Sequence, residues 1–334
     1  MTPFSKKLTV AIVVIMAVLG GRWFTSSQPQ TGAKTAQSMP SVGIIQVVEH
    51  PALDSTRQGI VDELKDSGYI PGKTMNLLYE SAQVNLGLAS QIVQKFLGQK
   101  VNVIVAIGTI PAQVAAQATQ TNPGTPVIFS SVTDPVGAKI VLHPEKPEGN
   151  ITGVSNYVEA GQHFALFRKV LATLKRLGVI YNPGDDNSVI LLGRMKEIAK
   201  TMNLEIVPVT ASKTSEVVAA AQSLVGKVDA IFVNNDNTAL AAFDSIVKVG
   251  QDHEIPVFVS DVDCLGKGAL AALGPDQYQL GRQTGKMLVK ILKGGAQPKD
   301  LPVEGPEKVD FKFNFEVARK LGLQNVDALL GSAE

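Results

Sequence analysis

The chain has 334 residues, of which 45% are hydrophobic and 18% charged, a globular rather than a disordered composition. This length exceeds one ordinary α/β domain and fits two. Lysine and arginine number 31 and aspartate and glutamate 30. The resulting net charge of +1, together with 5% aromatic residues, argues against a nucleic-acid partner. The one cysteine, Cys264, excludes an intramolecular disulfide and a cysteine-rich metal site.

Residues 1–40 have the pattern of an export signal followed by a polar linker. Lys6 and Lys7 precede an apolar run from Leu8 to Gly21, which is shorter than the roughly 20 residues of a membrane helix. We therefore expect a cleaved signal, with an uncleaved anchor near Trp23 as the alternative. No cysteine follows the run, so we expect no lipoprotein. Export without disulfides indicates a bacterial periplasm or the cell exterior.

From residue 41 onward, apolar β-branched segments alternate with segments of helical periodicity, a pattern that predicts doubly wound parallel sheets. In the first half we expect strands at 42–48, 75–79, 101–107 and 126–130, and helices at 55–67, 87–99 and 111–119. In the second half we expect strands at 177–181, 204–209, 230–233, 256–259 and 308–313, and helices at 187–202, 214–226, 238–252, 278–293 and 316–321. The segment 149–163, rich in Gly, Asn and Thr, is interpreted as a crossover between two α/β lobes.

Two such lobes in series create a cleft at the carboxyl ends of their strands, where ligands of doubly wound sheets bind. The sequence contains no glycine-rich dinucleotide fingerprint, no phosphate-binding Walker loop, no Gly-x-Ser-x-Gly elbow and no His-Glu-x-x-His motif. The histidines, of which there are four, lack ligand spacing. We therefore predict a binding protein, with no catalytic residue, metal or cofactor.

Polar residues follow the expected strands of the first half, where they would meet in the cleft. Thr109 follows the third strand at the start of a helix, whose free N–H groups suit a carboxylate. Thr109 is explained equally well as a plain helix cap, the cluster after the fourth strand as a turn, and His50 as a solvated loop residue. The candidates in this half are Glu49, His50, Thr109, Ser131, Thr133 and Asp134.

The second half has two comparable clusters. Asn235 and Asp236 follow one buried strand, and Asp261 follows the next. The two carboxylates are candidates for pairing with a ligand ammonium. The alternatives are helix capping by Asp236 and a turn at Asp261. The segment 182–184, Asn-Pro-Gly, is interpreted mainly as a turn.

Several segments together resemble one family, the ABC transporter substrate-binding proteins of the tryptophan-binding-protein-like group, which have the type I periplasmic-binding fold. The resemblance covers the chain from residue 41 to the end. Asn156, which directly follows one of these segments, completes the candidate site. The segments are Gly43–Gln46, Gly108–Thr109, Ser130–Ala138, Asn150–Ser155, Asn234–Thr238, Gly268–Gly274, Leu280–Met287 and Asn314–Gly322.

The resemblance implies a monomeric carrier that delivers a small, amino-acid-like solute to an ABC permease in the membrane. It implies a ligand carboxylate at Thr109 and residues 131–134, and an ammonium at Asp236 and Asp261. It also implies three crossings between lobes. The first lobe would then comprise 41–155 and about 275–298, and the second 156–274 and about 299–334. Asn234-Asn235 stands where many members have Pro-Thr. The ligand can therefore differ from the ligands of those members, while the transport role is kept.

Two other functions remain open from the sequence. One is a ligand-sensing module held at the membrane by an uncleaved anchor. The other is a periplasmic enzyme built on the same two-lobed frame, which requires a nucleophile or an acid/base pair in the cleft.

Overall fold

The computed structural model describes residues 39–120 and 124–323, so the predicted signal or anchor lies outside the described residues. Within the described ranges, none of the helices combines the length and the apolar character needed to cross a bilayer. Residues from Pro40 onward form one compact unit, and the rest of this description concerns that unit alone.

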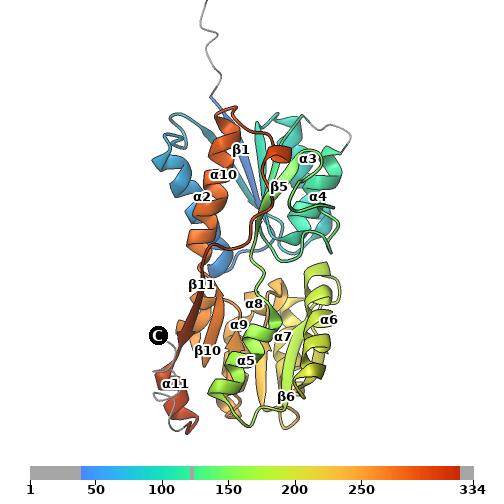
Figure 1. Ribbon diagram of the computed structural model, residues 1–334, viewed down its shortest axis with the longest axis vertical. Coiled ribbons are helices and arrows are strands. Elements are labelled where there is room, and N and C mark those ends of the chain that lie inside the picture. The colour runs from blue at the N-terminus through green and yellow to red at the C-terminus, as the bar shows by residue number, and fades with distance from the viewer. Residues whose placement is uncertain (1–38, 121–123, 324–334) are drawn as a thin grey trace, which may run out of the picture. The chain divides into compact units, whose positions relative to one another are not determined.

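The first lobe is a five-stranded parallel sheet in the order β2-β1-β3-β4-β5, flanked by α2, α3, α4 and α10 (Figure 1). Its central strands β1, β3 and β4 are buried along most of their length, as expected for a sheet covered on both faces. The bounds are β1 Ser41–Gln46, α2 Pro51–Asp66, β2 Asn76–Ser81, α3 Leu86–Gly98, β3 Val103–Ile107, α4 Thr109–Thr119, β4 Val127–Val132, β5 Ile151–Ser155 and α10 Gln277–Leu292.

The second lobe is a six-stranded sheet in the order β11-β10-β9-β8-β6-β7, parallel except for the edge strand β11. A cluster of stacked and edge-on aromatic rings from α5, β8 and β9 fills one side of its core. The bounds are α5 Ala160–Val170, β6 Arg176–Tyr181, α6 Asp186–Thr201, β7 Glu205–Thr210, η1 Thr214–Glu216, α7 Val217–Ser223, β8 Ala230–Val233, α8 Asn237–Ala241, α9 Phe243–Asp252, β9 Val257–Val259, η2 Val262–Lys267, β10 Ala271–Pro275, β11 Val309–Phe313 and α11 Phe315–Lys320.

These two sheets confirm the predicted fold class, while several elements differ from the expectation. The presumed crossover 149–163 contains a whole strand, β5, and the start of α5. That segment was interpreted as a crossover because it is rich in Gly, Asn and Thr, and Gly153 is one of these residues. In the structure this glycine lets β5 lie against β4, because a Cβ there would stand 2.1 Å from the carbonyl oxygen of Phe129. Strand β10 was also not predicted, and the expected helix 238–252 is two helices, α8 and α9.

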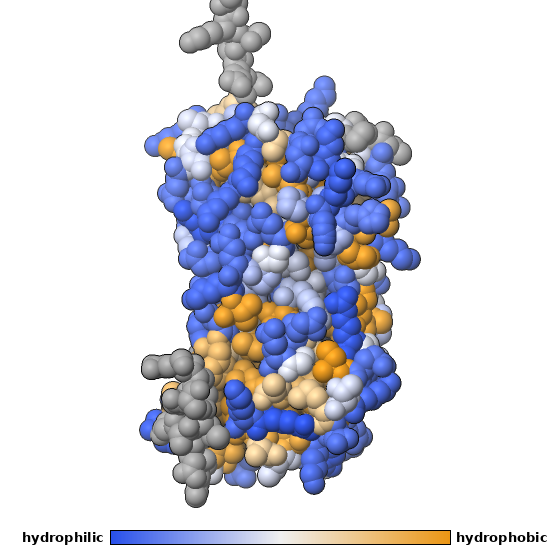
Figure 2. Space-filling view, in the orientation of Figure 1, coloured by the Kyte–Doolittle hydropathy of each residue, from blue (hydrophilic) through white to orange (hydrophobic). Residues whose placement is uncertain are grey.

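Helix α10 packs directly on α2, with backbone against backbone (Figure 1). A Cβ on Gly59 would lie 2.1 Å from the carbonyl oxygen of Tyr278, and one on Gly281 equally close to that of Thr56. The outer side of this pair is charged, with Arg282 bonded to acidic side chains of α2. Figure 2 accordingly shows a largely hydrophilic surface over these helices.

The chain passes between the lobes three times. The first passage follows β5, the second lies at Asp276 between β10 and α10, and the third precedes β11. The third passage occurs later than the boundary near residue 299 suggested by the sequence. Glu304 still bonds to β5, because its N–H donates to the oxygen of Gly153 at 3.0 Å and its oxygen accepts from the N–H of Ser155 at 2.8 Å.

Candidate functional site

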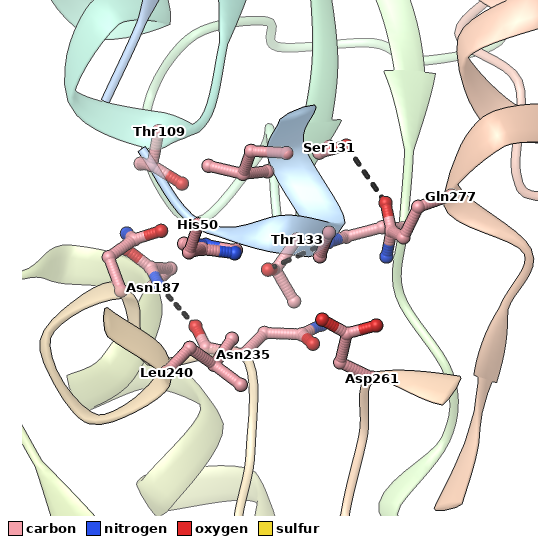
Figure 3. A pocket seen from close by; sticks show the side chains of 13 residues that line it. His50, Thr109, Ser131, Thr133, Asn187, Asn235, Leu240, Asp261 and Gln277 are labelled. Carbon is pink, nitrogen blue, oxygen red and sulfur yellow. Dashed lines mark hydrogen bonds between the residues drawn. The ribbon is translucent and has the colours of Figure 1, made fainter. Parts of the chain in front are cut away.

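One pocket lies where the carboxyl ends of both sheets face each other (Figure 3). The cavity between these walls has a volume of about 20 Å³, room for about one water molecule, so the pocket is nearly closed in this structure. Side chains from the loops after β1, β3, β4, β5, β6, β8, β9 and β10 reach it. The lining residues are His50, Ala52, Leu53, Thr109, Ser131, Thr133, Asn156, Asn187, Asn235, Asn237, Leu240, Asp261 and Gln277.

The structure brings seven of the ten residues singled out from the sequence into this pocket: His50, Thr109, Ser131, Thr133, Asn156, Asn235 and Asp261. The other three, Glu49, Asp134 and Asp236, do not line it.

Asp236 lies just behind the pocket, and its carboxylate is fully used within the second lobe. One oxygen accepts from the N–H of Ala239 at 2.7 Å and caps α8. The other accepts from the N–H of Asn182 and the hydroxyl of Ser188. Burial raises the pKa of this carboxyl group. The arrangement is the helix-capping alternative, and it leaves no oxygen directed toward a ligand.

Asp134 and Glu49 are likewise engaged elsewhere. Asp134 accepts from the N–H of Gly137 at 2.9 Å and from the guanidinium of Arg194, on α6 of the other lobe. Glu49 is exposed and accepts from the hydroxyl of Tyr79 at 3.3 Å. Asp134 therefore links the two lobes beside the pocket rather than within it.

A bulge in β4 directs Ser131 into the first-lobe wall. The register of β4 shifts between Ser130 and Val132, and Ser131 itself has φ of 55°, in the left-handed region. Its hydroxyl donates to Oε1 of Gln277 at 3.3 Å. Thr133, two residues on, is also in the wall, where its hydroxyl donates to Asn156 at 3.1 Å.

Thr109 occupies a different position from the helix cap expected. The N-cap of α4 is Gly108, with φ of 95°, and Thr109 is the first residue of the helix. Only glycine suits position 108, since its φ is positive and a Cβ would stand 2.6 Å from the Val47 side chain. This tight turn places Thr109 and the amino end of α4 at the pocket.

Asp261 forms the acidic part of the second-lobe wall and is only 1% exposed. Its oxygens accept from the N–H of Asp263 at 3.0 Å and from the thiol of Cys264 at 3.4 Å. Burial raises the pKa of Asp261 to about 6. A buried carboxylate with such weak compensation gains from a cationic partner.

His50 and Asn187 carry polar atoms that have no hydrogen-bond partner among the described residues. Both ring nitrogens of His50 and Oδ1 of Asn187 are in this state, although the residues are 5% and 3% exposed. Burial lowers the pKa of His50 to about 4, so the ring is neutral at pH 7. The side-chain amide of Asn187 donates an N–H to the backbone carbonyl oxygen of Asn235 at 2.7 Å.

Sequence reasoning missed six lining residues, namely Ala52, Leu53, Asn187, Asn237, Leu240 and Gln277. Two of them had a usable signal. Asn187 opens the helix expected at 187–202, just after the segment 182–184 that was interpreted mainly as a turn. Gln277 opens α10 directly after a crossing, where its Oε1 also accepts from the hydroxyl of Thr56 at 3.0 Å.

Among the residues that the structure describes, no group of three or more His, Cys, Asp or Glu side chains is arranged to hold a metal ion. The pocket instead offers hydroxyls, amides, one carboxylate and a few aliphatic side chains. This set suits a small polar or zwitterionic molecule with an apolar part.

Comparison with known proteins adds a family and relatives. The family model described as ABC transporter substrate binding protein matches residues 41–334. A tyrosine-binding protein of Clostridioides difficile is 32% identical over 97% of this chain and 95% of its own length. A conserved domain protein from Vibrio cholerae is 38% identical, with a TM-score of 0.84 over 88% of this chain and 98% of its own. An ABC domain from Streptococcus, solved in complex with L-Trp, is 31% identical with a TM-score of 0.83 over the same shares.

Proposed function

Because the chain belongs to the ABC transporter substrate-binding protein family, we propose that it captures an amino acid, preferably an aromatic one, in the pocket between its lobes and delivers it to an ABC permease. The observation that carries this proposal is the pocket itself. It combines a buried, weakly compensated carboxylate on one lobe with hydroxyls and a helix amino end on the other.

The ammonium of the ligand is assigned to Asp261. An ammonium within hydrogen-bond distance replaces the solvation that burial removes, and the interaction is strong because the surroundings exclude water. The ligand carboxylate is assigned to the opposite wall, at the hydroxyls of Ser131 and Thr133, which exchange their bonds to Gln277 and Asn156 for bonds to the carboxylate. Thr109 and the amino end of α4 add a favourable dipole on this side of the pocket.

An aromatic ligand is supported by the relatives and by the apolar side chains of the wall. Two relatives carry tyrosine or tryptophan in their descriptions. Ala52, Leu53 and Leu240 offer aliphatic surface to a ring. Burying such a ring contributes about 25 cal/mol per Å² of apolar surface removed from water.

Closure of the two lobes around the ligand is the proposed mechanism of capture. Two polar contacts join the lobes beside the pocket. The guanidinium of Arg194 donates to Asp134 at 2.5 Å, and Gln113 donates to Asp186 at 2.7 Å. Both contacts break if the lobes separate. Closure therefore forms them together with the ligand contacts, and the permease distinguishes closed from open protein.

Export to the periplasm or the cell exterior follows from this role, as does an N-terminal signal or anchor. The intact mass of the exported protein separates the alternatives, because a cleaved signal leaves no anchor for a membrane-bound sensor. The enzyme alternative predicts turnover of the bound compound, whereas the binding protein returns it unchanged.

Thermal unfolding of ligand-stripped protein with a panel of amino acids and small solutes tests the function. A ligand at 100 times its Kd stabilises the folded state by about 2.7 kcal/mol, which gives a clear rise in Tm. We expect the largest rise with an aromatic amino acid. A well-folded protein that shows no rise with any amino acid contradicts the proposal.

A further inference from the structure

The strongest unexplained feature of the pocket is the set of buried polar atoms without partners on His50 and Asn187. Other polar side chains of the wall pair with one another, as Thr133 does with Asn156 and Ser131 with Gln277. A buried polar atom without a partner typically costs about 1–3 kcal/mol. A ligand that supplies the missing partners recovers this cost, and one that does not is rejected.

The chemistry of the missing partner follows from the two side chains. The amide of Asn187 is oriented by the bond from its N–H to Asn235, so Oδ1 remains and can only accept. The neutral ring of His50 has one nitrogen that donates and one that accepts. A hydroxyl can serve both residues, because it donates to Oδ1 of Asn187 and accepts from the ring N–H of His50, which leaves the second ring nitrogen of His50 for water or another group of the ligand.

The position of these atoms assigns them to the side-chain end of the ligand. In Figure 3, Asn187 and Asp261 lie on opposite sides of the pocket, with His50 and Leu240 between them. A ligand whose ammonium pairs with Asp261 therefore extends its side chain past the aliphatic surface toward Asn187.

We propose that Asn187 and His50 form a specificity subsite that recognises a hydroxyl at the far end of an aromatic ring, so that the pocket selects a phenolic amino acid over its unsubstituted counterpart. This inference rests on the proposed function and deepens it. Phenylalanine offers nothing to either residue. The indole N–H of tryptophan donates to Asn187 and cannot accept from His50.

Isothermal titration calorimetry with L-tyrosine, L-phenylalanine and L-tryptophan tests the subsite, because the first two differ only by the hydroxyl. We expect the wild-type protein to bind tyrosine at least about 10-fold more tightly than phenylalanine, the effect of leaving buried polar atoms unpaired. Asn187→Leu removes the acceptor at similar volume. We expect it to bring the two affinities within about 3-fold, mainly by weakening tyrosine.

Asn237→Leu is the matched control, since Asn237 also lines the pocket but already donates to Asp185 at 3.1 Å. It is expected to keep the preference for tyrosine, whatever its effect on overall affinity. His50→Phe provides a second variant that also reduces the preference if Asn187→Leu does not fold.

The ratio of the wild-type affinities for tyrosine and phenylalanine tests the subsite independently of any variant. Equal affinity for tyrosine and phenylalanine overturns the subsite while leaving the proposed function intact, and so does a preference that survives Asn187→Leu. Absence of binding by all three amino acids overturns the proposed function as well.

Discussion

Replacing Asp261 by asparagine removes the buried carboxylate from the pocket without changing the size of the side chain. Asp261 is 1% exposed, and its oxygens receive only an N–H and a thiol from the protein. If it binds the ligand ammonium, Asp261→Asn loses a charge-assisted hydrogen bond of about 1.5–3 kcal/mol. We therefore expect the Kd for the amino acid to rise about 10- to 100-fold at pH 7.5.

The pH dependence of ligand affinity gives a second, independent test of the role of Asp261. Burial raises the pKa of Asp261 to about 6, and an ammonium pairs with the ionised form only. Binding then lowers this pKa and releases a proton, so affinity increases with pH. At pH 5, one unit below the pKa, roughly one carboxylate in eleven is ionised, and affinity should be about 10-fold weaker than at pH 7.5. Asp261→Asn should show no such step.

Titration calorimetry of both proteins at pH 7.5 and pH 5 measures the two effects. Asp263→Asn is the matched control, because that residue is exposed, lies outside the pocket and is two positions away. It should retain the step, with a midpoint at lower pH, since the charge of Asp263 helps to raise the pKa of Asp261.

The reasoning is refuted if Asp261→Asn binds with unchanged affinity, or if its affinity still falls about 10-fold at pH 5. The second result would assign the step to Asp185. Burial also raises the pKa of that carboxyl group to about 6, although it does not line the pocket.

Three further predictions concern closure and stability. Arg194→Ala removes the contact with Asp134 between the lobes, so stopped-flow displacement should show faster ligand dissociation with little change in Tm; an unchanged rate contradicts a role in closure. Gly281→Ala forces α10 away from α2 and should cost about 1–3 kcal/mol of stability in thermal unfolding. Gly193→Ala, in open space on α6, is the control and should be neutral or stabilising. Equal effects of the two substitutions would refute the packing argument. His163 is buried with its pKa lowered to about 4, so the unfolded chain binds the proton more readily and stability falls as pH drops from about 6.5 to about 4. In urea unfolding, the free energy of unfolding of His163→Gln should fall by about 2 kcal/mol less than that of the wild type between pH 7 and pH 5. An equal fall in both proteins would exclude His163 as the source of this pH dependence.

Much of the fold was predictable because its strands are short apolar runs and its helices have clear periodicity. Strand β8 was predicted with its observed bounds, 230–233, from such a run. Strand β5 was missed because a glycine that permits a close backbone approach contributed to the interpretation of 149–163 as a crossover. Gly153 in β5 is required by contact with the neighbouring strand, a fact visible only when both strands are in place.

The site was predictable to the extent that polar residues follow buried strands. Which of two adjacent residues enters the pocket depends on local backbone geometry that a sequence does not reveal. Asn235 lines the pocket while Asp236 caps α8. Ser131 reaches the pocket because of the β4 bulge, and nothing in its sequence neighbourhood marks that bulge. Gln277 was missed since its contacts come from segments more than 140 residues away in the chain.

The late return of α10 to the first lobe has a consequence for biosynthesis. Leu280, Met287 and Leu288 of this helix are buried in the first-lobe core, and Gly59 of α2 lets the helix pack closely. A ribosome makes the whole second sheet up to β10 before it makes these residues. The nascent first lobe therefore stays incomplete, with apolar surface uncovered, until nearly nine-tenths of the chain exists. If the chain is exported unfolded, as proposed, this order of synthesis delays folding of the first lobe before export.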